Sequence, residues 1–163
     1  MQENLDEKFI RKCIELSEES MKNGGAPFGA LIVQNGKIIA DSINNAQTKI
    51  LDHAEILVLD KVHKKLGTSN LSDCVLYSSC EPCPMCSFMI REYKIKKVVF
   101  SVLSPLMGGF SKWKILQDEG LSNCNNFFGK PPEGIASLLE NEGLKVMNKF
   151  PPFVGVFGNN AKN

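Results

Sequence analysis

The sequence predicts an α/β domain of three layers, α/β/α, built around a mixed and mostly five-stranded sheet. Segments with helical spacing of apolar residues alternate with short β-branched segments, in an order typical of this architecture. The 163 residues, 43% hydrophobic and 23% charged, suit a soluble chain with a single core. No repeat, low-complexity tract or linker divides the sequence, so we expect one domain over residues 1–163.

The first half of the chain is expected to form two helices separated by a hairpin. The expected elements are a helix over 5–22, strands over 27–34 and 37–43, and a helix over 52–66. Asn35-Gly36 between the two strands is a strong signal for a tight hairpin turn. Asp52 is a plausible N-cap for the second helix, and Gly67 would end that helix.

The second half is expected to continue the alternation of strands and helices. The expected elements are a strand over 74–79, a helix from Pro84 to about Tyr93, a strand over 96–102, a helix near 111–119, a helix entered at Pro131-Pro132 and ending at Asn141, and weak strands over 146–150 and 153–157. Pro82 and Pro84 make the segment between the first of these strands and its helix a loop.

Charge and composition exclude several classes of protein. Nineteen basic residues against eighteen acidic ones give a net charge of +1, which argues against a strongly basic nucleic-acid binder. No apolar run approaches the ~20 residues of a membrane span, so we expect no membrane partner. The polar start of the chain does not resemble a secretory signal, so we expect a cytoplasmic protein.

The six cysteines are unevenly spaced. Without a secretory signal a disulfide framework is not expected, yet Cys80, Cys83 and Cys86 crowd into seven residues. Such crowding favours metal or redox chemistry. An iron–sulfur run would need a further cysteine where Ile90 stands, which argues against that cluster.

A zinc site can be assembled from His53, Cys83 and Cys86. Thiolates and imidazole are ligands that zinc prefers, and both expected helix starts lie beyond strand ends, where α/β sheets place their ligands. Three protein ligands leave one position for a water, whose pKa zinc lowers to about 7. Glu55, two residues after His53, could move that water's proton to a substrate.

A purely structural zinc site is the main alternative interpretation. Such sites normally have four protein ligands. His63 lies ten residues beyond His53 on the same expected helix, about 15 Å along its axis, which is too far to share an ion.

His53-Ala54-Glu55 followed by Pro82-Cys83-Pro84-Met85-Cys86 resembles the zinc deaminase pattern of the cytidine deaminase-like superfamily. Similarity runs from about residue 7 to residue 103. Residues 24–40 and the segment LYSSCEPCPMC resemble the branch that holds guanine deaminase, fungal cytosine deaminase and bacterial tRNA adenosine deaminase. The second segment is especially similar to guanine deaminase.

This resemblance implies a role for each matching residue. His53, Cys83 and Cys86 would bind Zn²⁺, and Glu55 would be the catalytic proton carrier. The substrate would be held by Asn44, with Asn45 as the rival, and by Phe28, the backbone of Ala54 and the loop from Ser79 to Glu81. Residues 104–116 would also shape the pocket.

The predicted function is hydrolytic deamination of a nucleobase or nucleoside with release of ammonia. A guanine-like purine base is the first expectation for the substrate, and cytosine or cytidine the second. A tRNA-specific adenosine deaminase is an alternative, and Arg91, Lys94, Lys96 and Lys97 could then contact phosphate. A non-catalytic zinc-binding subunit is a further alternative, which the presence of Glu55 disfavours.

Aromatic residues gather near the end of the chain. They are Trp113, Phe127, Phe128, Phe150, Phe153 and Phe157. Such residues suit a core, a lid over the pocket or an oligomer interface, and we expect a homodimer.

Overall fold

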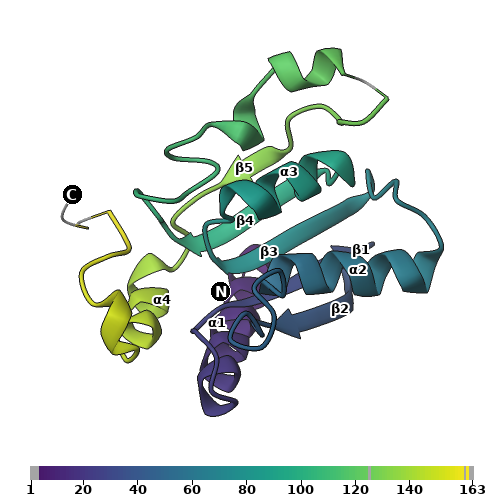
Figure 1. The fold of residues 1–163 in the computed structure, drawn as a ribbon. Helices are drawn as coiled ribbons and strands as arrows, with labels where there is room; N and C mark the ends of the chain where they lie inside the picture. Colours follow the sequence, from purple (N-terminus) through teal and green to yellow (C-terminus); the bar gives the residue numbers. More distant parts are fainter. Residues whose placement is uncertain (1–3, 125, 160, 162–163) are drawn as a thin grey trace.

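A five-stranded sheet with helices on both faces forms the part of the chain that the computed structural model describes, residues 4–124, 126–159 and 161 (Figure 1). The helices are α1 (Leu5–Lys22), α2 (Ala54–Leu66), α3 (Pro84–Glu92) and α4 (Glu140–Met147), and the strands are β1 (Gly29–Gln34), β2 (Lys37–Ile43), β3 (Cys74–Cys80), β4 (Lys97–Val102) and β5 (Glu133–Ile135). The predicted α/β/α architecture with a mixed sheet is confirmed.

The strand order is β2-β1-β3-β4-β5. β1 is antiparallel to β2 and β3, whereas β3, β4 and β5 are parallel to one another. The hairpin turn forms as predicted, because Asn35 and Gly36 both adopt positive φ angles, 51° and 73°. β3 and β4 end at the same edge of the sheet, and α3 starts beyond the end of β3.

Each face of the sheet is covered by a different pair of helices. α1 and α4 pack on one face, with buried side chains that include Ile10, Cys13, Leu31, Val99 and Val146. α2 and α3 pack on the other face, with buried side chains that include Ile32, Val58, Leu59, Ile90 and Phe100. α4 approaches β4 closely, because a Cβ at Gly143 would overlap the side chains of Ser101 and Val102.

The helix predicted near residues 111–119 does not form. This segment is a series of turns with a short 3₁₀ helix at Ile115–Gln117. The Arg91 side chain of α3 is buried and donates to the carbonyls of Ile115 and Asp118, both at 2.8 Å. These carbonyls are therefore bonded by a side chain distant in sequence, and the carbonyl of Ile115 also accepts the backbone N–H of Asp118 at 3.4 Å.

The elements predicted after residue 130 are also wrong. Residues 133–135 pair with β4 as a parallel strand, and the helix α4 begins where the predicted helix was expected to end. Neither weak strand prediction is correct, because residues 146–147 close α4 and residues 151–153 form a 3₁₀ helix. The backbone of β4 offered an unpaired edge, and that tertiary contact decided the structure of 133–135.

The basic cluster expected near the end of α3 is not one surface. Arg91 is buried, and the Nζ of Lys97 lies 2.8 Å from Asp6, which leaves Lys96 as the exposed member beside the half-buried Lys94. Among the described residues, no helix combines the length and the apolar character that crossing a bilayer requires.

Candidate active site

Three side chains from two helix starts meet at the edge of the sheet. His53 is the N-cap residue of α2 and Cys83 is that of α3, and neither side chain caps its own helix. The Sγ of Cys83 lies 3.5 Å from the Nδ1 of His53 and 3.5 Å from the Sγ of Cys86, which is 3.6 Å from the same Nδ1. The predicted meeting of the three groups is thus observed.

The position of His53 corrects one prediction. α2 begins at Ala54, so Asp52 is not its N-cap. Asp52 instead accepts a hydrogen bond from the side-chain amide of Asn45 at 3.3 Å, and it lies 3.9 Å from the Nζ of Lys49. These contacts brace the loop that leads into α2 and leave the imidazole of His53 to face the cysteines.

Hydrogen bonds link the three groups, and a divalent cation could take the place of the protons in these bonds. The hydrogen bond from the Cys86 thiol lowers the pKa of Cys83 to about 4, and the His53 ring adds to this effect. The same bond, together with burial, raises the pKa of Cys86, while the bond to Cys83 raises the pKa of His53. A bound cation would replace these shared protons.

The donor set fits zinc. One nitrogen and two sulfurs lie within 4.8 Å of one another, and no fourth His, Cys, Asp or Glu belongs to this group among the described residues. His63 points elsewhere, with its Nδ1 3.2 Å from the carbonyl of Thr68. Three protein donors are typical of a catalytic zinc site, since a structural site normally has four.

Glu55 lies next to this cluster in the first turn of α2. Its Oε1 accepts a hydrogen bond from the hydroxyl of Ser78 at 2.9 Å, and its Oε2 lies 3.6 Å from the Sγ of Cys86. Burial raises the pKa of Glu55, and the negative charge of Cys83 raises it further. A carboxyl group with a raised pKa is suited to accept and release a proton near neutral pH.

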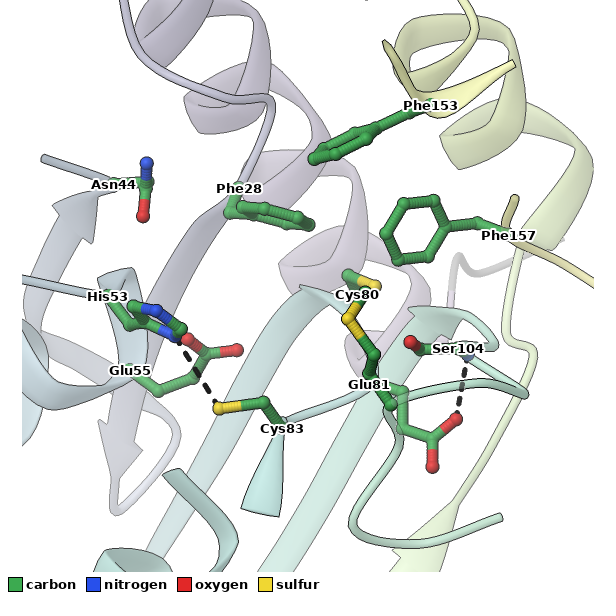
Figure 2. Close-up of a pocket in the computed structure, with 11 residues that line it drawn as sticks. Phe28, Asn44, His53, Glu55, Cys80, Glu81, Cys83, Ser104, Phe153 and Phe157 are labelled. Carbon is green, nitrogen blue, oxygen red and sulfur yellow. Dashed lines mark hydrogen bonds between the residues drawn. The ribbon is translucent and has the colours of Figure 1, made fainter. Parts of the chain in front are cut away.

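A cavity of about 140 Å³ opens beside the cluster. Its walls are formed by Phe28, Asn44, His53, Glu55, Cys80, Glu81, Cys83, Ser104, Met107, Phe153 and Phe157. Figure 2 shows His53, Glu55 and Cys83 together on one side of this cavity, with Phe28, Phe153 and Phe157 around it. A buried cavity of about 150 Å³ accepts one benzene ring, so this site is sized for a small ring.

The predicted substrate contacts divide into two groups. Asn44 and Phe28 line the cavity, whereas Asn45 bonds to Asp52 in the neighbouring loop. Ala54 and Ser79 are buried but are not among the residues that line the cavity. The Ser79 hydroxyl instead accepts a hydrogen bond from the backbone N–H at the start of β1, at 3.0 Å.

Ser104 and Met107 lie in the segment 104–116 that the resemblance expected to shape the pocket, although neither residue was named individually. Both follow β4 in a loop that begins with Ser104-Pro105 and turns at Gly108-Gly109. These turn residues directly after a buried strand are the local signal that could have identified them, because ligands bind beyond the carboxyl ends of parallel strands. Cys80 is the last residue of β3 and Glu81 follows it. Both belong to the segment from Ser79 to Glu81 that the resemblance indicated.

Phe153 and Phe157 reach the cavity from the end of the chain. Their rings are 4.8 Å apart, and both pack against Phe28, at 5.4 and 6.1 Å between ring centroids. Phe157 is also buried in a cluster with Cys80, Val102 and Met147, so the expectation of a core role is confirmed for it, and a lid over the pocket stays a prediction. Phe127 is 62% exposed and Trp113 is 56% exposed, so neither belongs to the core.

Comparison with known proteins agrees with this geometry. Residues 3–102 match the family model of the cytidine and deoxycytidylate deaminase zinc-binding region. The chain is 36% identical over 149 residues to a tRNA-specific adenosine deaminase of Bacillus subtilis, covering 89% of this chain and 88% of that protein. It is 43% identical over 98 residues to a guanine deaminase of the same organism, covering 58% of this chain and 63% of that protein.

Solved structures show the same fold. A structure from a study of A-to-I editing by tRNA:A34 deaminases superposes with a TM-score of 0.76 at 24% identity, covering 85% of this chain and 98% of that one. The Bacillus subtilis guanine deaminase superposes with a TM-score of 0.58 at 42% identity, covering 60% and 64%. This chain belongs to the zinc-binding cytidine and deoxycytidylate deaminase family and is a zinc-dependent hydrolytic deaminase.

Proposed function

We propose that this enzyme removes the exocyclic amine of a purine and that its first candidate substrate is an adenosine in tRNA. The sequence alone placed a free guanine-like base first. The relatives reverse that order, because the similarity to a tRNA-specific adenosine deaminase extends over nearly the whole of both chains, whereas the similarity to guanine deaminase covers 58% of this one.

The observation that carries the proposal is the position of Glu55 beside the His53, Cys83 and Cys86 donor set at the cavity. These three side chains would hold the zinc ion, which when bound lowers the pKa of a water molecule and so supplies the nucleophile. Glu55 is not part of the donor set, so its carboxylate remains available to carry protons.

Glu55 would carry protons in two directions. Its carboxylate first accepts the proton of the attacking water and delivers it to the ring nitrogen next to the reacting carbon. It then takes the remaining proton from the hydroxyl group that the water has added to the carbon and delivers that proton to the exocyclic amine. The carbon–nitrogen bond breaks, ammonia leaves and the added oxygen becomes the carbonyl of the product. The hydroxyl of Ser78, which donates to Oε1, holds the carboxyl in place while Oε2 faces the cluster.

Asn44 and Phe28 would orient the ring for this reaction. Asn44 is buried, and its backbone N–H donates to the carbonyl of Phe28 at 3.0 Å, so the two residues are fixed relative to each other. The Asn44 side chain can donate to and accept from a base edge, and the Phe28 ring can contact its face. Such orientation raises the rate because attack requires alignment.

A free purine base is the second candidate. The aromatic cover of the cavity, formed by Phe153 and Phe157, favours it. Phe153 and Phe157 line the cavity together with Phe28, so the wall beside the zinc donors is aromatic and suits a planar base without a sugar and phosphate chain. A polynucleotide would have to flip a base past this cover. Location in the cytoplasm and assembly as a homodimer remain predictions in either case.

The experiment is a measurement of ammonia release across tRNA, free purines, cytosine, cytidine and nucleotides. The proposal predicts that tRNA is converted with the highest kcat/KM and that inosine forms in it. Activity on tRNA should fall steeply with added salt, because phosphate contacts release counterions. Release from guanine alone would support the second candidate, and no release from any compound would overturn both.

A matched pair of variants controls the assay. Cys83→Ser removes one zinc donor and should abolish release from every compound tested. Cys124 is exposed and outside the donor set, so Cys124→Ser should retain full activity and zinc content.

A further inference from the structure

The cavity is lined by two buried glutamates whose surroundings differ. Glu55 accepts one hydrogen bond from an oxygen donor, the hydroxyl of Ser78, and its other oxygen faces the zinc donors. Glu81 accepts four hydrogen bonds, two at each carboxylate oxygen. A carboxylate offers about four acceptor positions, so Glu81 is saturated and Glu55 is not.

All four donors to Glu81 come from the loop of residues 104–111. Its Oε2 accepts from the backbone N–H of Ser104 and from the hydroxyl of Ser111, both at 2.8 Å. Its Oε1 accepts from the backbone N–H groups of Phe110 at 3.0 Å and Ser111 at 2.5 Å. Figure 2 shows the carboxylate turned towards Ser104.

The loop that Glu81 holds also forms part of the cavity wall. Ser104 and Met107, which line the cavity, lie in the same loop as its donors. Ser104 is 4% exposed and is therefore enclosed by the protein. The shape of this wall therefore depends on the Glu81 carboxylate, whose acceptor positions are all used within the protein and leave none for a substrate.

Two glycines allow the loop to dock. A Cβ at Gly108 would overlap the carboxylate of Glu81, and a Cβ at Gly109 would overlap the side chain of Ser87. The backbone N–H of Gly109 also donates to the carbonyl of Pro82 at 2.8 Å, directly before Cys83. The substrate wall is thus bonded to the segment that carries a zinc donor.

We propose that Glu81 is a positioning residue that keeps the 104–111 loop in register with the Cys83 segment, so that Ser104 and Met107 bind the substrate ring at a fixed distance from the zinc donors. The inference rests on the proposed deaminase function and deepens it. It assigns substrate binding to Ser104 and Met107, and it assigns no proton transfer to Glu81.

The first test perturbs the contact from both sides. Glu81→Gln keeps the shape but sets an NH₂ group against backbone N–H donors. Gly108→Ala adds a Cβ against the same carboxylate. Both variants should lower kcat/KM about 10- to 100-fold with a rise in KM, because misplacing a binding wall by about 1 Å has effects of this size. Zinc should remain at one per chain.

A double variant and two controls sharpen this test. Since both changes break one contact, the KM of the double variant Glu81→Gln/Gly108→Ala should not exceed that of the worse single variant. Ser111→Ala removes one donor hydroxyl and should raise KM by less. Glu92 is exposed on α3, so Glu92→Gln should leave KM unchanged.

A second measurement does not depend on activity. Amide hydrogen exchange at Ser104, Phe110 and Ser111 should accelerate in Glu81→Gln, while exchange in β3 is unchanged. Unchanged KM and unchanged exchange would overturn the assignment of Glu81. A fall in kcat at constant KM would also overturn it, by placing Glu81 in the chemical step. An inactive wild-type chain would instead overturn the proposed function.

Discussion

Replacement of Arg91 by methionine tests how the long segment after β4 is held. The Arg91 guanidinium donates to the carbonyls of Ile115, Asp118 and Gly129 and to the hydroxyl of Ser122, at 2.8 to 3.2 Å. Methionine has a similar length and is apolar, so Arg91→Met removes these bonds with little change in packing.

The magnitude follows from the burial of each acceptor. The bond to Ile115 is buried, so its carbonyl would keep only the 3.4 Å bond from the backbone N–H of Asp118, at a cost of about 1–3 kcal/mol. The other three bonds are partly buried, and water can replace part of each, so together they add about 1–2 kcal/mol. We expect Arg91→Met to lose about 3 kcal/mol of unfolding free energy, which a domain with 5–15 kcal/mol survives.

Urea unfolding measures this loss, and hydrogen exchange locates it. Exchange should accelerate around Ile115 and Gly129, while the amides of β3 and β4 remain protected. Lys96 is an exposed neighbour, so Lys96→Met serves as the control and should change the unfolding free energy by less than about 0.5 kcal/mol. A loss below about 1 kcal/mol in Arg91→Met would refute this account of the segment.

Three further predictions concern pH, zinc and the aromatic cover. Burial raises the pKa of Asp6, but bonds from Lys97 and Tyr77 outweigh this effect and lower the pKa. The stabilisation that Asp6 contributes is therefore present above pH 3.8 and lost as the pH falls through the folded-state pKa. Asp6→Asn should lose about 1–3 kcal/mol of unfolding free energy near pH 7, measured by urea unfolding, and its stability should depend less on acid. Chelation of zinc should lower Tm, because an ion present at 1,000 times its Kd adds about 4 kcal/mol; an unchanged melting curve would argue against a bound metal. Phe157→Ala should raise KM about tenfold in steady-state kinetics, since an aromatic contact with the substrate contributes about 1 kcal/mol or more. Phe127 is exposed, so Phe127→Ala should leave KM unchanged. Equal effects of the two changes would exclude a specific contact between Phe157 and the substrate.

Local signals in the sequence predicted the helices and strands of the first two thirds of the fold, apart from the N-cap of α2. Asn35-Gly36 has the positive φ angles that its hairpin turn requires, and Gly67 ends α2 in a left-handed conformation with φ of 67°. The spacing of His53, Cys83 and Cys86 also predicted a cluster that the structure brings together. In each case the controlling interaction lies within a few residues, or within a motif specific to one chemistry.

The last third depends on contacts that no local pattern encodes. β5 exists because residues 133–135 meet the free edge of β4, and residues 111–119 are turns because Arg91 bonds their carbonyls. A loop likewise separates Asn44 from Asn45, since Asn44 lines the cavity whereas Asp52 engages Asn45. Ser104, which lines the cavity, bonds to Glu81, a partner 23 residues away in sequence.

Substitution of Glu55 by glutamine tests the central claim most directly. Glutamine has the same shape but its amide cannot accept and release a proton near neutral pH. General acid–base catalysis contributes a factor of about 10²–10⁴ to a rate. We predict that Glu55→Gln binds one zinc per chain and loses kcat by at least about 100-fold, whereas the exposed Glu19→Gln retains kcat. A zinc-loaded Glu55→Gln protein that releases ammonia at the wild-type rate would contradict the account.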